Sequence, residues 1–175
     1  MTSPAADSPL VIKGWSIFAH PQFLDTFDSL VAQVERLRVK DPKGYTAKNS
    51  TKRLAAIVKL AFEIIPEDPT RPEYRQGATL GDEYKHWFRA KFFQQYRLFF
   101  RYHRENRIII YAWINDEDTK RAYESDSDAY RTFRRTLKSG NPPDEWNQLL
   151  RQARAQNKRT RAARDSKSLM RRSDT

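Results

Sequence analysis

The stretch WFRAKFFQQYRLFFRY, residues 87–102, decides the fold. Aromatic and aliphatic side chains alternate in it with permanent cations, which is the period-two pattern of half-buried β-strands. We predict strands at about 86–93 and 95–103, and a third at about 107–114 after the turn residues HRENR. Three strands in a row joined by short connections indicate an antiparallel sheet.

The cations in this stretch raise a question of function. Because side chains alternate between the two faces of a strand, Arg89, Lys91, Arg97 and Arg101 should share the face opposite the apolar rows, with rings such as Trp87 among them. Cations interleaved with flat rings suit single-stranded nucleic acid, which needs charge for its phosphates and rings for its bases. The competing interpretation is that these charges only keep the sheet from aggregating.

The residues before these strands contain one strand candidate and two helical patterns. Residues 11–19 are one short strand candidate, and an apolar stripe at spacings of three and four predicts a helix from Pro21 to about residue 37. A second amphipathic helix is predicted at about 45–64. The fold class is therefore α+β, with two N-terminal helices packed on one face of a mostly antiparallel sheet and the other face left open to water or a ligand.

Helices are also predicted after the strands. Ser127 should cap the helix DAYRTFRRTLKSG, and Asp144 should cap a last helix that runs into a basic tail. Residues 151–175 contain nine Lys or Arg and two acids, within a net charge of +11 for the chain. A disordered end and a helix that binds a polyanion both fit this composition. We expect a disordered leader at 1–10, one folded domain at 11–150 and the basic tail at 151–175.

Composition excludes several classes of protein. The chain of 175 residues has no cysteine, so disulfides, cysteine-ligated zinc and thiol catalysis are ruled out. No apolar run approaches the roughly 20 residues of a membrane span. The first ten residues, MTSPAADSPL, lack the pattern of a signal peptide. We expect a cytoplasmic protein with no membrane contact and no cofactor.

The acidic residues argue against a metal-dependent nuclease. Such an enzyme needs clustered carboxylates, and the strands predicted at about 86–93 and 95–103 have none. The consecutive acids at 116–118 cannot all face one ion. Cleavage by the RNA's own 2′-OH instead needs cations for the phosphorane and groups that move protons. The three histidines, His20, His86 and His103, are candidates for moving protons, because the ordinary pKa of histidine is close to neutral. Only His86 lies near the cations in the sequence, and alternation points its side chain to the opposite face of the sheet.

The chain resembles a known family between about residues 12 and 150. The matching segments are GWSIFAHPQF, DSLVAQVERL, KDP, YRLFFRY, WINDEDTKRAY and DAYRTFRRTLKSGNPPDEW. They are similar to the YhaV-type toxins of bacterial type II toxin–antitoxin modules, which belong to the RelE-like superfamily of mRNA interferases. The resemblance implies a RelE-like, microbial-RNase-like fold and metal-independent cleavage of mRNA, often on the ribosome.

The resemblance also implies partners. A cognate PrlF-type antitoxin with an AbrB-like DNA-binding domain would inhibit the toxin, and the operator DNA would be bound only through the complex of the two proteins, which represses its own operon.

Site residues follow from the same resemblance. A basic pair on one strand and an Arg in YRL on the next contact the scissile phosphate, and these positions fall on Arg89, Lys91 and Arg97. Arg89 would stabilise the phosphorane, and the other two would bind the scissile and adjacent phosphates. Trp87 and Arg101 are expected to contact RNA nearby.

The segment after the third strand would complete the site. Tyr123 occupies the place of a recurring tyrosine of the family, and Arg121 accompanies it. This chain departs from the RelE-like pattern there, because the acidic run NDED replaces a basic residue. Glu117, or Tyr123 with a lowered pKa, would then take the 2′ proton. The turn FFQQ also lacks the expected glycine.

Two other functions remain open on the sequence. A non-catalytic RNA- or ribosome-binding module would use the same cations only to hold its ligand. A DNA-binding repressor would need a basic recognition helix, for which DAYRTFRRTLKSG is the one candidate.

Overall fold

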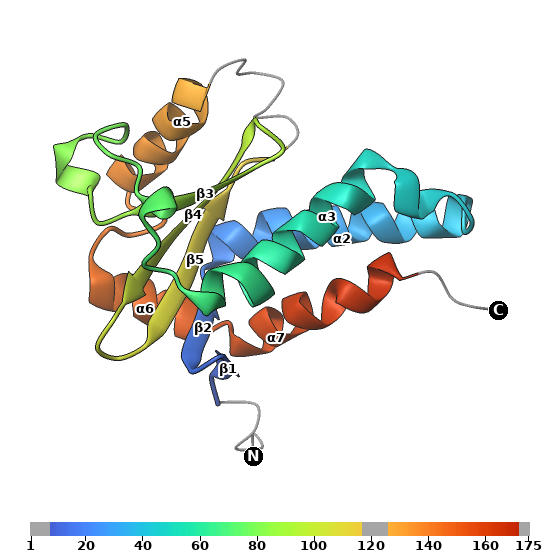
Figure 1. The fold of residues 1–175 in the computed structure, drawn as a ribbon, viewed down its shortest axis with the longest axis horizontal. Coiled ribbons are helices and arrows are strands. Elements are labelled where there is room, and N and C mark those ends of the chain that lie inside the picture. Colours follow the sequence, from blue (N-terminus) through green and yellow to red (C-terminus); the bar gives the residue numbers. More distant parts are fainter. Residues whose placement is uncertain (1–7, 117–125, 172–175) are drawn as a thin grey trace.

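A computed structural model describes residues 8–116 and 126–171 as an α+β protein. Its sheet has five strands in the order β1-β2-β5-β4-β3, and all neighbours are antiparallel except the parallel pair β2 and β5. The strands predicted from the opening stretch are confirmed, since β3 spans Phe88–Phe92, β4 Tyr96–His103 and β5 Ile108–Ile114. Strand β3 forms one edge of the sheet and β5 lies at its centre (Figure 1).

The N-terminal strand is a hairpin. We predicted one strand over 11–19, but β1 (Leu10–Ile12) and β2 (Trp15–Ala19) pair antiparallel around Lys13 and Gly14. Both turn residues have positive φ, 52° and 84°. Two successive positive φ angles are the geometry of a tight hairpin turn, and glycine accepts it without strain. The chain therefore reverses within the segment that we predicted as a single strand.

The two predicted N-terminal helices cover one face of the sheet. Helix α2 spans Pro21–Lys40, and α3 spans Asn49–Lys59, preceded by the short 3₁₀ helix η1 (Tyr45–Ala47) and continued by a π-helical turn, η2 (Leu60–Ile64). Their apolar stripes pack against the rows of β3, β4 and β5 that alternation assigned to this face. This core includes Phe23, Phe27, Leu54, Ile57, Ala90, Leu98, Phe100 and Tyr111.

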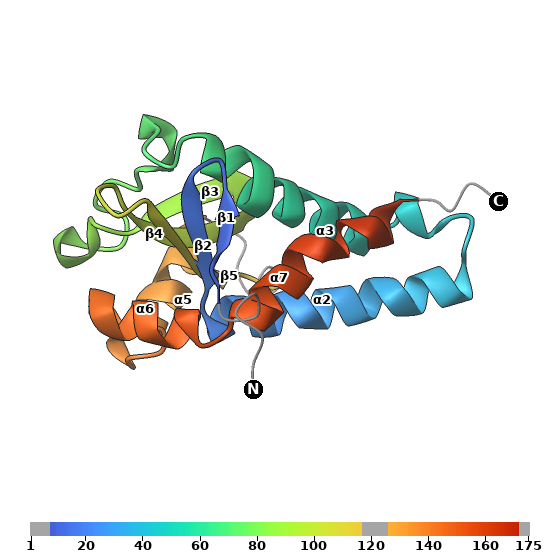
Figure 2. The same cartoon turned by 90° about the horizontal axis from the view of Figure 1, so that it is seen from below.

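Helices also cover the second face of the sheet, which the sequence analysis left open. Helix α5 (Asp126–Lys138) and helix α6 (Trp146–Arg154) lie on this side (Figures 1 and 2). A second hydrophobic core joins them to the sheet, and it includes Phe18, Trp87, Phe99, Ile110, Trp113, Tyr130, Phe133, Leu137, Leu149 and Ala153. The prediction of an uncovered face is therefore wrong, because the aromatic residues of α5 need burial as much as those of the strands do.

The described part of the basic C-terminal segment is helical and packed. Helix α7 (Asn157–Asp165) and the 3₁₀ helix η6 (Ser166–Met170) return along α2 and α3 (Figure 2). Ala163 and Leu169 join the first core. Arg159 pairs with two carboxylates of α2, Asp25 at 2.9 Å and Asp28 at 2.8 Å. Of the two alternatives for this segment, the structure therefore favours the helix.

Within residues 8–116 and 126–171, no helix combines the length and the apolarity that a membrane span requires.

His20 joins the start of α2 to α6. It is the N-cap residue of α2, where its Nδ1 accepts a hydrogen bond from the backbone N–H of Gln22 at 3.1 Å. Its Nε2 lies 2.6 Å from Oε1 of Gln152 on α6. Burial lowers the pKa of His20 below its ordinary value, although the bond to Gln152 and the charge of Asp25 act in the opposite direction. The folded state therefore favours the neutral ring.

This depressed pKa makes stability depend on pH. An unfolded histidine binds a proton near pH 6.5, before the folded one does, so the free energy of unfolding should fall as the pH drops from about 7 to about 5. His20→Asn keeps an N-cap acceptor and removes the titrating group. We expect urea unfolding to show a smaller loss of stability at low pH for His20→Asn than for the parent. Parallel stability curves for the two proteins over this range would contradict this assignment.

Candidate active site

The β3–β4 ladder confirms the predicted alternation. Lys91 lies directly opposite Arg97, and Arg89 lies opposite Phe99. Opposed residues of an antiparallel pair point to the same face, so these three cations share the α5 side of the sheet. Arg101 lies on this side too, since it pairs with Ile110 of the second core.

The rings on this side lie in the core and cannot receive a base. Trp87 and Phe99 are 0% exposed and Trp113 is 6% exposed, because Phe133 and Tyr130 of α5 pack on them. The Trp87 ring therefore does not lie at the surface beside the cations as we expected. It can affect RNA binding only by holding its neighbours in place.

Arg89 is half-buried at the edge of the sheet and is held by two acceptors. Its Nε donates to the hydroxyl of Tyr130 on α5 at 2.8 Å, and its Nη1 donates to the carbonyl oxygen of Glu73 at 2.6 Å. These bonds fix the direction of the guanidinium and leave its Nη2 edge without a hydrogen bond that involves the described residues. No ion pair neutralises Arg89 among them either.

A recess of about 340 Å³ runs along the outer edge of β3. Arg89 and Lys91 reach it from the strand, and Arg71 reaches it from the loop before the strand. Arg71 is paired with Glu67 at 3.2 Å and lies 3.9 Å from Glu73. The remaining lining comes from the π-helical turn, from the neighbouring 3₁₀ helix η4 (Pro72–Tyr74) and from β3, namely Leu60, Ile64, Glu73, Tyr74 and Ala90, so that three cations face one carboxylate.

Lys91 and Arg97 differ in their access to solvent. Lys91 is exposed, and no ion pair in the described ranges involves it. Arg97 is 1% exposed, and its Nη1 donates to the carbonyl oxygens of Gln94 at 2.7 Å and Tyr96 at 2.8 Å. Its guanidinium is therefore turned back onto the β3–β4 turn. The three cations lie on one face as predicted, but one of them lies beneath the surface.

Asn115 holds the backbone at Arg97. Its Oδ1 accepts from the backbone N–H of Arg97 at 2.8 Å, and its Nδ2 donates to the carbonyl oxygen of Gln95 at 3.0 Å. Phe93 and Gln94 in this turn have positive φ, 47° and 60°. We expected a glycine in this turn, and the side chain of Asn115 helps to hold a conformation that non-glycine residues rarely adopt.

Arg101 has a structural environment. Its Nη1 donates to the backbone carbonyl oxygen of Asp144 at 2.6 Å, and its guanidinium lies over the rings of Trp87 and Trp146 at 5.4 and 5.1 Å. Burial lowers the pKa of Arg101, while the carboxylates of Asp144 and Glu145 oppose that shift. An arginine remains charged at neutral pH, so these contacts stabilise a cation. Arg101 thus binds the loop before α6 to the sheet.

Asp144 joins the loop before α6 to the residues that precede β3, and it is not the helix cap we predicted. Its Oδ1 accepts from Nε1 of Trp87 at 2.7 Å and lies 2.7 Å from Nε2 of His86. Glu145 caps α6 instead, because its carboxylate accepts from the backbone N–H of Gln148 at 2.6 Å. His86 and Trp87 both precede β3, so their side chains do not have to point to opposite faces of the sheet, and both can reach the same carboxylate.

The other two histidines lie in structural positions. The imidazole of His103 lies beside the Trp146 ring at 5.8 Å, and its Nδ1 accepts from the backbone N–H of Asn106 at 3.2 Å. His20 caps α2. Neither histidine lines the recess beside Arg89 and Lys91.

The remaining predicted site residues, Glu117, Arg121 and Tyr123, lie outside the described residues. The chain enters their segment at Asp116, directly after Asn115, and so from a point beside Arg97.

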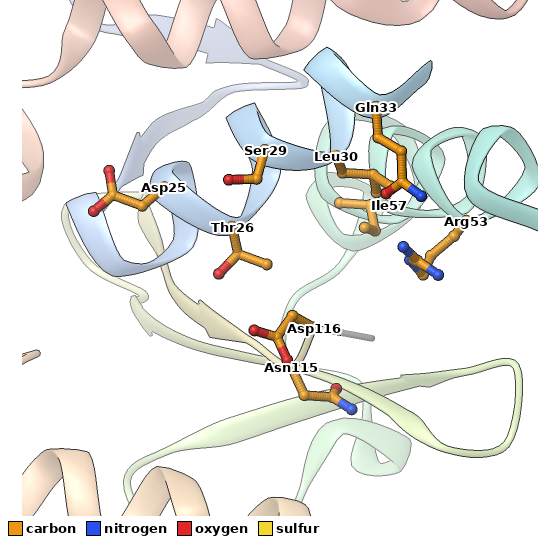
Figure 3. A pocket seen from close by; sticks show the side chains of 9 residues that line it. All are labelled: Asp25, Thr26, Ser29, Leu30, Gln33, Arg53, Ile57, Asn115 and Asp116. Atoms are coloured by element: carbon orange, nitrogen blue, oxygen red, sulfur yellow. The ribbon is translucent and has the colours of Figure 1, made fainter. Parts of the chain in front are cut away.

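A second hollow of about 380 Å³ opens near that point, between α2, α3 and the end of β5 (Figure 3). Side chains of α2 and α3 face Asn115 and Asp116 across it. Arg53 lies over the Tyr96 ring and donates to its hydroxyl at 3.2 Å. Because Asp25 and Asp116 also line this hollow, its charge is mixed and suits a polyanion less well than the recess at β3 does.

Sequence reasoning missed three contributors to the site, namely Arg71, Tyr130 and Asn115. Arg71 lies in a proline-rich loop whose path the sequence does not define. Tyr130 lies in a helix that the sequence predicts, but nothing local indicates which residue its hydroxyl contacts. For Asn115, the only signal is a polar amide directly after a fully apolar strand.

Comparisons with known proteins identify the family to which the chain is similar. Residues 17–154 match the model of the YhaV toxin family, described as a toxin with endonuclease activity of a toxin–antitoxin system. The ribonuclease toxin YhaV of Escherichia coli K12 is 45% identical over 148 residues, which cover 83% of this chain and 96% of the relative. The toxin YhaV of Escherichia coli O157:H7 matches with the same identity and coverage. No solved structure matches the chain significantly.

The role of Asp144 is testable by stability. Asp144→Ala leaves the indole N–H of the fully buried Trp87 without its acceptor, which should lower the free energy of unfolding by about 1–3 kcal/mol. Asp144→Asn keeps an oxygen acceptor and should lose less, and so should His86→Ala, which leaves the bond to Trp87 intact. Urea unfolding of the three variants measures these differences. A stability of Asp144→Ala equal to that of the parent would show that the carboxylate does not hold this corner.

Proposed function

Because the chain belongs to the YhaV family of toxins with endonuclease activity, we propose that Arg89, Lys91 and Arg97 form the site where it cleaves RNA. The observation that carries this proposal is the recess at the edge of β3, which Arg89 and Lys91 line from the strand and Arg71 lines from the loop before it, while Arg97 lies opposite Lys91 in the ladder. A positively charged concavity of this kind attracts the phosphates of a nucleic acid. We also propose that the α+β fold is RelE-like.

Each cation takes a distinct role in the proposed reaction. Arg89 stabilises the charge that develops on the phosphorane, since Tyr130 and the Glu73 carbonyl hold its guanidinium in a fixed direction. Lys91 binds the scissile phosphate from the exposed side of the strand. Arg97 adds positive potential from beneath the surface, and it contacts an adjacent phosphate only when the β3–β4 turn moves.

The proton transfers are assigned to the segment after β5. Glu117 takes the 2′ proton, or Tyr123 does so with a lowered pKa, and Arg121 contacts RNA beside them. The bond between Asn115 and the backbone of Arg97 supports this assignment, because it brings the start of that segment next to the cations. Attack by the 2′-OH on phosphorus then breaks the bond to the 5′ oxygen, which takes up a proton and leaves as a 5′-hydroxyl, and a 2′,3′-cyclic phosphate remains without a metal ion taking part. Trp87 and Arg101 support the site by holding the sheet against the loop before α6.

The biological setting follows the family. The substrate is mRNA, cleaved on the ribosome or free in the cytoplasm, and its loss stops translation and growth. A PrlF-type antitoxin with an AbrB-like domain neutralises the toxin, and operator DNA is bound only through that complex. The alternative is a module that binds RNA or the ribosome without cleaving it. Turnover separates the two, because a binder protects RNA from degradation.

Single substitutions test the proposed site. Arg89→Ala and Lys91→Ala should each reduce the rate of RNA cleavage by on the order of 10²–10³, since each removes one electrostatic contact to the reacting phosphate. Neither residue is fully buried, so both variants should unfold at nearly the parent's urea concentration. The measurement is single-turnover cleavage of a fluorescent RNA, together with growth arrest at equal expression.

Arg104→Ala is a matched control, because Arg104 is an exposed cation in the β4–β5 turn, away from the recess. It should cleave like the parent. Full activity of Arg89→Ala would show that the site lies elsewhere in the chain.

The chemistry of the cut is tested on the substrate. An RNA with 2′-deoxyribose at the cleaved nucleotide lacks the attacking hydroxyl and should resist cleavage at that bond, while neighbouring bonds stay sensitive. The unmodified RNA should be cut in the presence of EDTA and yield 2′,3′-cyclic phosphate ends, which mass spectrometry identifies. Cleavage of the deoxy-substituted bond at the normal rate would rule out attack by the 2′-OH.

A further inference from the structure

Helix α2 extends beyond the sheet that it covers. Its twenty residues span about 30 Å, and its buried side chains end at Val34. The last turns of α2, the connection through η1 and the first turn of α3 therefore form an arm that leaves the body of the protein. Figures 1 and 2 show this arm in both views, with the C-terminal segment beside it.

The arm has a high density of unneutralised positive charge. Residues 35–52 contain six cations and two acids, and all six cations are exposed. No ion pair within the described part of the chain involves any of them. One of the two acids, Asp41, accepts a hydrogen bond from the backbone N–H of Gly44 at 3.0 Å. The six cations are Arg36, Arg38, Lys40, Lys43, Lys48 and Lys52.

The C-terminal segment adds to the same surface. The hydroxyl of Tyr45, in η1, donates to the carbonyl oxygens of Leu169 at 2.7 Å and Arg171 at 3.2 Å. These bonds place η6 and its exposed cations Lys167 and Arg171 beside the arm. This segment lies beyond residues 17–154, which match the family model. The chain thus carries a basic extension that reinforces a basic arm.

Folding does not explain all of these charges. Arg38 and Lys40 favour the C-terminal end of the α2 dipole, but Lys48 and Lys52 lie at the start of α3, where a positive charge is unfavourable. The first turn of α3 has no acidic residue to compensate. Lys48 and Lys52 are also four positions apart, a spacing at which like charges repel along a helix. A bound polyanion would offset this repulsion.

The chemistry of the arm selects the kind of polyanion. Tyr45 is the one aromatic residue of the arm, and it is buried, so no ring is available to stack on the bases of a single strand. A protein partner would need an apolar centre to its interface, and Val39 is the one large apolar side chain exposed within residues 35–52. Cations without rings suit a phosphate backbone whose bases are paired.

We propose that this basic arm binds the backbone of folded, double-helical RNA at a surface separate from the cleavage site. RNA is the partner because the family relative is a ribonuclease. Phosphates of an A-form helix lie at its surface and can be contacted without reading its sequence. The arm would hold the enzyme on structured RNA while the recess at β3 acts on a single strand.

Binding without cleavage tests the arm. The background is the double variant Arg89→Ala, Lys91→Ala, and the probe is an RNA duplex of roughly 20 base pairs, titrated at several salt concentrations. We compare the arm variant Arg36→Gln, Lys40→Gln, Lys43→Gln, Lys48→Gln with a control that loses the same charge elsewhere. The control is Arg104→Gln, Lys138→Gln, Arg151→Gln, Lys158→Gln, all exposed and outside both surfaces.

The arm variant should bind the RNA duplex at least about tenfold more weakly than the background, and its salt dependence should have a slope smaller by roughly two to four. The control should lose less affinity. With Arg89 and Lys91 restored, the arm variant should still cleave a short single-stranded RNA at the parent's rate, which separates this proposal from the proposed cleavage site. Equal losses in the arm and control variants, or tighter binding to a DNA duplex of the same sequence, would overturn the proposal.

Discussion

The burial of β5 on both faces is the constraint on which the rest of the structure depends. All seven residues of this strand are buried, and its side chains are divided between two hydrophobic cores. Burying apolar surface on both sides requires a layer of helices on each. Helices α2 and α3 form one layer, and α5 and α6 form the other. The sheet therefore has no broad open face, and solvent reaches the cationic row mainly along its edge.

Because helices cover both faces of the sheet, the surroundings of the cations of β3 and β4 differ between the middle of the sheet and its edge. Arg97 and Arg101 lie within the sheet, where a charged group needs hydrogen-bond acceptors to offset the loss of water. Arg97 finds them in the β3–β4 turn, and Arg101 finds one in the loop before α6. Arg89 and Lys91 belong to the edge strand and reach the recess. Cationic side chains thus serve architecture in the middle of the sheet and stay accessible to a ligand at its margin.

The cations of the recess and the cations of the basic arm lie on different sides of the molecule. The recess along β3 lies at the far edge of the sheet from β1, and the arm of α2 and α3 leaves the body on another side (Figure 2). Helix α7 and η6 hold the arm to the body of the protein, because Arg159 pairs with carboxylates of α2 while η6 packs against Tyr45. A rigid connection between the two surfaces would let one RNA be held at one place and cut at another.

The sequence by itself determined the three consecutive strands β3, β4 and β5, the faces on which the side chains of β3 and β4 lie, the two N-terminal helices and the excess of positive charge. Alternation in a strand and the period of a helix follow from backbone geometry, so they can be read locally. Only the tertiary structure decided that Phe133 and Tyr130 cover the second face, that Arg97 turns inward while Lys91 stays exposed, and that Asp144 binds Trp87 instead of capping α6. The first and the last of these outcomes depend on contacts between residues roughly 30 to 60 positions apart, and no local period encodes which distant side chain will fill a given space. Arg97 turns onto nearby carbonyl oxygens of the β3–β4 turn, whose backbone the more distant Asn115 holds.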